Sequence, residues 1–214
     1  GEKKSLVPFA ASSIPLVTLG TFLLWFGWFG FNGFSQLAMG TFDDVNAISK
    51  IAVNTHLAGA AGTVTGAAIT RLLGGKTDIV MMLNGALAGL VAITAEPLTP
   101  GPITAMIIGS IGAVIMYFGT KMLEGFGIDD VVGAIPVHMF AGIFGTLVVP
   151  FTNADTSLGT QFVGTLSVVL FSFVLSYLVF MAMKVTIGLR ISKAAEKLGT
   201  DKAEVGVIAY SIRD

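Results

Sequence analysis

The sequence predicts an all-α protein that crosses a membrane several times, and three observations lead to this fold class. Only 12 % of the 214 residues are charged, whereas a soluble domain carries about 25 %. Hydrophobic residues make up 54 % of the chain, and they occur in runs of about 20, the length at which a helix crosses a bilayer. Short polar segments rich in turn-forming residues separate these runs. We therefore expect a polytopic membrane protein with six transmembrane helices.

The six expected helices follow one another with connections of 5 to about 15 residues. They cover the ranges 14–36, 51–73, 79–95, 102–119, 131–150 and 160–187. The chain is thus divided into an N-terminal segment 1–13, a transmembrane region 14–188 and a charged tail 189–214. The first run is longer than the core of a signal peptide and lacks a small-residue cleavage site, so we interpret it as a true span. The absence of an initiator methionine suggests processing, or a piece of a longer protein.

Lysine and arginine predict the orientation of the chain in the membrane. If the N-terminus is cytoplasmic, then every lysine and arginine except Lys50 lies in a cytoplasmic segment or at the inner end of a helix. Cytoplasmic segments of membrane proteins carry this excess of basic residues. We therefore expect a cell-membrane protein with both ends of this chain in the cytoplasm.

The first helix carries an aromatic face in the stretch "LLWFGWFGFNGFSQ". Trp28, Phe31, Asn32 and Ser35 are spaced as residues on one side of a helix. They lie about 21 to 31 Å along the helix from Ile14, near the expected outer surface. Aromatic faces attract cations, but tryptophans at this depth commonly anchor a helix at the interface. The residues alone favour the anchor interpretation for Trp28 and for Trp25.

The second and third helices carry small residues at helical spacing. Gly62 and Gly66 are four residues apart, as are Gly85 and Gly89, and alanines fill the neighbouring positions. Such faces allow two helices in lipid to approach closely. Tight packing of each of these helices against a neighbouring helix is the expectation. His56, in the first turns of the second helix, is interpreted as a surface histidine.

The fifth helix holds the second of the two histidines, His138, in the stretch "IDDVVGAIPVHMFAGIFG". Asp129 and Asp130 precede it, where they can cap free N–H groups at the helix start. Pro136 removes a backbone donor and disturbs the helix beside the imidazole. An ionisable residue at this depth is a candidate for function. His138 either lines a path for a small polar solute or packs against a neighbouring helix, and the residues alone leave both open.

The sequence gives little support to an enzyme. It contains no cysteine, which excludes disulfides and thiolate metal sites. We see no catalytic triad, no cluster of metal-ligating residues and no phosphate-binding loop, so we expect neither a metal nor another cofactor. The net charge of −1 gives no reason to expect a nucleic-acid partner.

Several motifs together resemble the Amt-type ammonium transporters. They are "LGTFLLWFGWFGFNGFSQLA", "VNTHLAGAAG", "LNGALAGLVAITAE", "IDDVVGAIPVHMFAGIFG" and the tail "GLRIS…GTDKAEVGVIAY". Their order and spacing fit the second half of such a transporter from about residue 14 to the end. Members of this family have eleven spanning helices in two inverted halves. The resemblance therefore implies that the six helices correspond to the second half and that the first five spans belong to a partner or to a missing segment.

The resemblance also assigns roles to individual residues. Phe31 is similar to one of two stacked phenylalanines that close the outer end of the pore, and Ser35 to the hydroxyl of the external ammonium site. Trp28 matches a tryptophan of the same pore-facing helix. His138 is similar to the second member of a histidine pair that lines the conduction path.

The tail resembles the region that contacts neighbouring subunits and the PII signal protein in this family. The matching residues are Asp201, Glu204, Gly206 and Tyr210. Two departures stand out. Phe34 precedes the serine where the family has a small residue, which narrows the expected vestibule. Val205 and Val207 flank Gly206 where the family pattern differs, which puts regulation by PII in doubt.

The resemblance implies transport of ammonium or ammonia through a hydrophobic, histidine-lined pore, by a larger assembly that is a trimer in the family. Two alternatives remain. One is an ammonium-sensing membrane receptor that signals without conducting, although the tail is too short for a kinase or cyclase. The other is a structural half with no activity until its N-terminal half is supplied.

Overall fold

The computed structural model describes residues 11–209, and this part of the chain contains helices and no strands. The all-α prediction is thus confirmed. The helices are α1 (Ile14–Phe34), α2 (Phe42–Gly74), α3 (Ile79–Thr94), α4 (Pro102–Gly125), α5 (Ala141–Val148), α6 (Leu158–Thr186) and α7 (Lys193–Leu198). Shorter turns are the π-helical η1 (Ile135–Phe140) and η3 (Asp201–Val205) and the 3₁₀ turn η2 (Val149–Phe151). Each of the six expected spans overlaps one of these helices or, for the fifth, η1, α5 and η2.

Three of the helices in the described residues are long and apolar enough to cross a membrane, namely α1, α4 and α6. The helix α3 and the segment Ile135–Phe151 are apolar but shorter. The compact parts of the chain divide between Phe162 and Val163, so that α1 to α5 form one unit, whereas most of α6 and the tail belong to the other. Each unit is described by itself.

The start of α2 differs from the prediction. The helix begins at Phe42, nine residues before the expected boundary. The reason is a capping box: the Thr41 hydroxyl accepts a hydrogen bond from the Asp44 backbone N–H, and the Asp44 carboxylate accepts one from the Thr41 backbone N–H. This arrangement satisfies two helix-terminal donors at once. The segment that was expected to be a loop is therefore the first part of a 33-residue helix.

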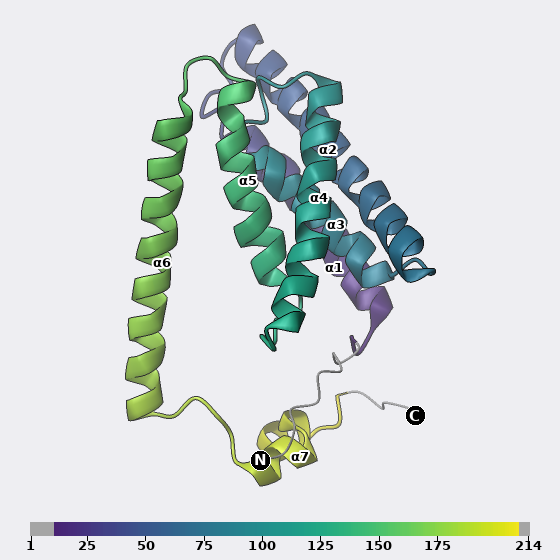
Figure 1. Ribbon diagram of the computed structural model, residues 1–214, viewed down its shortest axis with the longest axis vertical. Coiled ribbons are helices and arrows are strands. Elements are labelled where there is room, and N and C mark those ends of the chain that lie inside the picture. The colour runs from purple at the N-terminus through teal and green to yellow at the C-terminus, as the bar shows by residue number, and fades with distance from the viewer. Residues whose placement is uncertain (1–10, 210–214) are drawn as a thin grey trace. The chain divides into compact units, whose positions relative to one another are not determined.

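The helix α3 lies among α1, α2, α4 and α5 in the first unit (Figure 1). Its buried residues extend from Leu83 to Ile93 along its length. The tight helix packing that these glycines predict is confirmed, and the structure shows that α2 and α3 are the partners, because a Cβ atom built on Gly85 would lie 2.6 Å from the Gly62 carbonyl oxygen. One built on Gly66 would lie 2.9 Å from the carbonyl oxygen of Met81. Only glycine permits two backbones this close.

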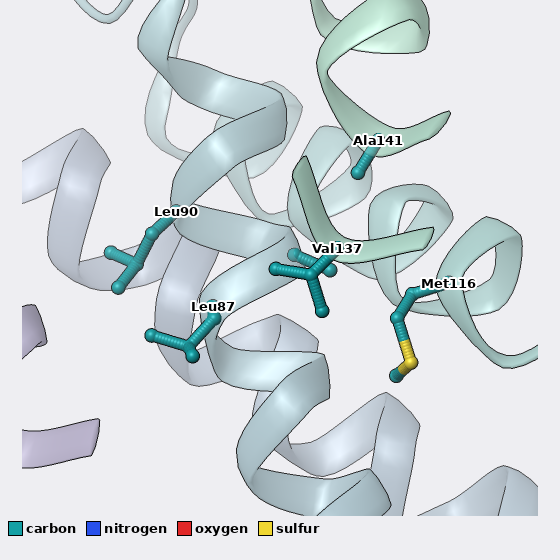
Figure 2. Close-up of a cluster of buried hydrophobic side chains, with 6 residues drawn as sticks. Leu87, Leu90, Met116, Val137 and Ala141 are labelled. Atoms are coloured by element: carbon teal, nitrogen blue, oxygen red, sulfur yellow. The ribbon is translucent and has the colours of Figure 1, made fainter. Parts of the chain in front are cut away.

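A buried apolar cluster joins α3, α4, η1 and α5. Leu87 and Leu90 of α3, Met116 of α4, Val137 of η1 and Ala141 of α5 belong to this cluster, and Figure 2 labels them. Val137 is 2 % exposed and Ala141 is fully buried. These contacts fix which side of η1 faces the core. His138, the residue after Val137, is consequently turned away from this cluster and is exposed.

Candidate functional site

A cavity of about 600 Å³ lies between α1, α3 and the η1–α5 segment. It brings together three residues that are distant in the sequence and that the sequence had singled out, Trp28, Phe31 and His138. The complete lining comprises Leu23, Leu24, Gly27, Trp28, Phe31, Val91, Thr94, Ala95, His138, Gly142 and Thr146. Most of these side chains are apolar, so a solute in the cavity meets few hydrogen-bonding groups.

His138 lies in the π-helical turn η1 and lines the cavity. Its side chain forms no hydrogen bond with any residue between 11 and 209, the part of the chain that the structure describes. Pro136 lacks the donor needed for a regular α-helical turn, and its carbonyl oxygen accepts the hydrogen bond of the Ala141 N–H five residues later. This geometry favours the solute-facing interpretation of His138 over the packing interpretation.

The start of η1 is capped as the sequence predicted. The two carboxylate oxygens of Asp130 accept hydrogen bonds from the backbone N–H groups of Ala134 and Ile135, at 2.9 and 2.7 Å. Gly133 adopts a left-handed conformation, φ 72°, that suits glycine best. Asp130 therefore holds the backbone of Ala134 and Ile135 in place, a few residues before His138.

Trp28 is held in place by a partner that the sequence did not reveal. Its indole Nε1 donates a hydrogen bond of 2.7 Å to the Thr94 hydroxyl, which in turn donates to the Leu90 carbonyl oxygen at 2.6 Å. The rings of Trp28 and Phe31 meet edge to face, with centroids 5.9 Å apart. Trp28 therefore forms part of the cavity wall, and its polar edge is directed at α3 instead of at a membrane interface.

A second hollow of about 530 Å³ contains Ser35. Gly27 and Phe31 line both hollows, so Phe31 stands between Ser35 and the cavity that contains His138. The Ser35 hydroxyl donates a hydrogen bond to the Phe31 carbonyl oxygen at 2.9 Å, which leaves its oxygen free to accept. Phe34, the bulky residue that the sequence predicted would narrow this region, also lines the second hollow.

Asn32 of the aromatic face and the nearby Trp25 both contact α2. Asn32 is 1 % exposed and donates a hydrogen bond of 3.0 Å to the Thr55 hydroxyl of α2, so it joins two helices instead of facing the cavity. Trp25 packs against α2. Its ring packs on Gly59, where an added Cβ would meet it at 2.9 Å, and on His56, with centroids 5.5 Å apart. Because Gly59 of α2 has no side chain, the Trp25 ring can lie against the α2 backbone.

His56 is exposed, as the sequence predicted, and does not line either hollow. In addition to Trp25, its ring stacks on Phe29 with centroids 6.2 Å apart. The two histidines thus have different environments, since His56 packs on aromatic rings and His138 faces an open cavity. Within residues 11–209 no group of three or more acidic, histidine or cysteine residues could hold a metal ion.

The tail residues lie in the second unit, which also contains most of α6. Asp201 begins η3, and its carboxylate accepts a hydrogen bond of 3.0 Å from the Ala209 backbone N–H. This bond is the largest of the interactions that lower the pKa of Asp201 below its ordinary value of 3.8. Glu204 lies in the same turn, and Gly206 ends it in a left-handed conformation with φ 75°. Tyr210 lies outside the described residues.

Comparison with known proteins identifies the kind of protein that has this arrangement. Residues 2–210 match the model of the Ammonium Transporter Family. The chain is 40 % identical to the ammonium transporter Amt2 of Archaeoglobus fulgidus over 92 % of this chain and 46 % of that protein. It is 39 % identical to a putative ammonium transporter of Synechocystis over 88 % of this chain and 44 % of the relative.

Solved structures give the same result. A protein titled Sensor Amt Protein superposes with a TM-score of 0.83 at 34 % identity, over 90 % of this chain and 49 % of the other. Mep2 of Candida albicans gives a TM-score of 0.78 at 29 % identity, over 91 % of this chain and 46 % of the other. The chain spans about half the length of the relatives it matches, as expected for one half of such a protein. By sequence and by fold, this chain belongs to the ammonium transporter family.

Proposed function

We propose that this chain supplies one half of a transporter for ammonium or ammonia, and that the cavity containing His138 forms one side of the conduction path. The observation that carries this proposal is the position of Phe31, which lines the hollow with Ser35 on one side and the cavity with His138 on the other. An outer hollow with one hydroxyl, an aromatic barrier and an apolar chamber with one imidazole thus follow in sequence.

The chemistry of ammonium fits this order of residues. Outside the barrier, the Ser35 oxygen accepts a hydrogen bond from the ion, and aromatic faces attract its charge. Together they replace part of the water shell. The apolar cavity disfavours the charged form of the solute, so ammonium transfers a proton to a base, for which a ring nitrogen of His138 is the candidate in the cavity lining, and continues as ammonia. A neutral imidazole accepts one hydrogen bond and donates another, which allows His138 to hold ammonia and to take part in moving the proton.

The proposed assembly supplies the opposite wall of the path. On α1, Leu23, Leu24 and Phe31 line the cavity and yet are 63, 52 and 63 % exposed. We expect the five preceding spans of the family architecture to cover them, and the complete unit to form a homotrimer in the membrane. Both ends of this chain lie in the cytoplasm in this proposal, where the tail is available to the PII signal protein.

Reconstitution into liposomes tests the proposal. The assembled protein that contains this chain is placed in vesicles loaded with a pH-sensitive dye, and an inward ammonium gradient is applied. Transport predicts a change of internal pH several times faster than in protein-free vesicles of the same lipid. The absence of any difference from protein-free vesicles would refute transport.

The sensor alternative has one observation in its favour, since a structural neighbour with a TM-score of 0.83 is titled Sensor Amt Protein. The same vesicles separate the two functions. A sensor predicts that ammonium changes the protease sensitivity of the tail while the flux stays at the protein-free level. A transporter predicts flux whether or not the tail responds.

A further inference from the structure

The polar groups of the cavity lead us to propose that Thr146 is a second solute-contacting residue, at which the hydroxyl oxygen accepts a hydrogen bond from an N–H donor. This inference rests on the proposed function, because the donor in question is ammonia, ammonium or a small amine that occupies the cavity. Thr146 was not among the residues that the sequence singled out.

Four of the eleven lining residues carry a polar side-chain atom: Trp28, Thr94, His138 and Thr146. Two of these four bind each other, since the Trp28 indole donates to the Thr94 hydroxyl. The Thr94 proton is directed to the Leu90 carbonyl oxygen. The pair is therefore largely occupied by its own hydrogen bonds, and His138 and Thr146 remain to contact a solute.

The hydroxyl of Thr146 has a defined direction. It donates its proton to the Gly142 carbonyl oxygen of the same helix, at 2.9 Å. A hydroxyl has one proton and two lone pairs, so a hydroxyl whose proton is used in this way offers only acceptor positions. Thr146 can therefore accept a hydrogen bond from a solute that carries N–H or O–H donors.

Gly142 lies between His138 and Thr146 on the cavity wall. His138, Gly142 and Thr146 succeed one another at intervals of four residues and all line the cavity, so they form one stripe along η1 and α5. Glycine places no side chain between the imidazole and the hydroxyl. At 1.5 Å per residue the two polar groups are about 12 Å apart along the helix. A solute that moves along this wall therefore meets Thr146 and His138 one after the other.

The test compares Thr146→Val with Thr146→Ser in the assembled protein in liposomes. Valine keeps the shape of threonine and removes the acceptor, whereas serine keeps the hydroxyl. Loss of one hydrogen bond to the solute predicts that the ammonium concentration for half-maximal flux rises about threefold to tenfold in the valine variant. The serine variant stays within about twofold of the parent protein, because it can direct its proton to the same carbonyl.

Thr63→Val is the matched control. The Thr63 hydroxyl also donates to the carbonyl oxygen four residues earlier, at 2.8 Å, but Thr63 does not line the cavity. Its valine variant should leave the half-saturation unchanged. If Thr146→Val transports with the half-saturation of the parent, or if serine and valine raise it equally, the role of Thr146 is overturned while transport itself stands. If the parent protein carries no flux, the proposed function and this inference both fail.

Discussion

The Trp28 indole and the Thr94 hydroxyl join α1 to α3 through a hydrogen bond of 2.7 Å at the wall of the cavity. This bond orients the ring that meets Phe31 edge to face. A half-buried indole N–H without its acceptor loses free energy, because no neighbouring group of the apolar wall replaces the hydroxyl. The Trp28 side chain, which forms part of the cavity wall, is thus positioned by Thr94 on a different helix.

Replacement of Thr94 by valine should therefore destabilise the protein by about 1–3 kcal/mol, since it leaves the indole N–H unsatisfied. Thr94→Ser keeps the acceptor and should cost less than half as much. Thermal unfolding in detergent measures both. Thr18→Val serves as control, because among residues 11–209 the Thr18 hydroxyl bonds only to the Ile14 carbonyl oxygen of its own helix. Equal losses for Thr94→Val and Thr18→Val would show that the contact between α1 and α3 contributes nothing.

The close approach of α2 and α3 gives a second prediction. Gly85→Ala should lower the free energy of unfolding by more than 2 kcal/mol, because the new methyl group meets the backbone of Gly62 and neither backbone can yield. Gly164→Ala on α6 has no atom within 4 Å of the new methyl group. Alanine is the better helix former by about 1 kcal/mol, so this control should be neutral or slightly stabilising.

Titration with denaturing detergent compares the two alanine variants. The outcome that contradicts close packing is a Gly85→Ala protein as stable as the parent, since that requires α2 and α3 to separate without cost.

Asp130 gives a prediction about local order. Removal of its carboxylate in Asp130→Ala deprives the N–H groups of Ala134 and Ile135 of their acceptor, at an expected cost of about 1–2 kcal/mol. Amide hydrogen exchange should become faster in η1, the turn that carries His138, and stay unchanged in α2. Asp129→Ala removes the adjacent carboxylate and is the matched control. Protection of η1 that is equally lost in both variants would assign the effect to charge instead of capping.

The tail gives a prediction about pH. The bond from the Ala209 N–H lowers the pKa of Asp201, so the contact is favoured above the ordinary value of 3.8 and is lost as the pH falls through the lower value in the folded tail. The carboxyl carbon of Asp201, followed by nuclear magnetic resonance, should titrate with a midpoint below 3.8. Ala209→Pro has no backbone N–H and should raise this midpoint. A midpoint at or above 3.8 in the parent protein would contradict the bond.

Much of the fold could be predicted because its signals are local or periodic. The spacing of Gly62, Gly66, Gly85 and Gly89 predicted close helix packing, although not which helices would pair, and the position of Asp130 predicted a helix cap. The early start of α2 could also have been found, because Thr41 and Asp44 have the spacing of a capping box. Apolar runs alone could not reveal it, since the first turns of α2 mix apolar residues with polar and charged ones.

The candidate site was predicted only in part, for a physical reason. Trp28, Phe31 and His138 are unusual residues at their depth, whereas a threonine in a spanning helix usually bonds to its own backbone and gives no sign of another role. Thr94 and Thr146 were missed on that account. The helical spacing places Asn32 on the same face as Trp28 and Phe31, but a side chain at the edge of a face can turn to either side. Its hydrogen bond to Thr55 of α2 determines the side to which Asn32 turns.

Contact of His138 with the solute is tested most directly by a flux measurement that compares the two histidines. His138→Ala and His56→Ala are reconstituted at equal protein content, and the rate of methylammonium uptake is measured in each. We predict that His138→Ala changes the rate at least tenfold, because it removes the one imidazole of the cavity, and that His56→Ala stays within about twofold of the parent. A His138→Ala protein that takes up methylammonium at the rate and with the selectivity of the parent would contradict the account.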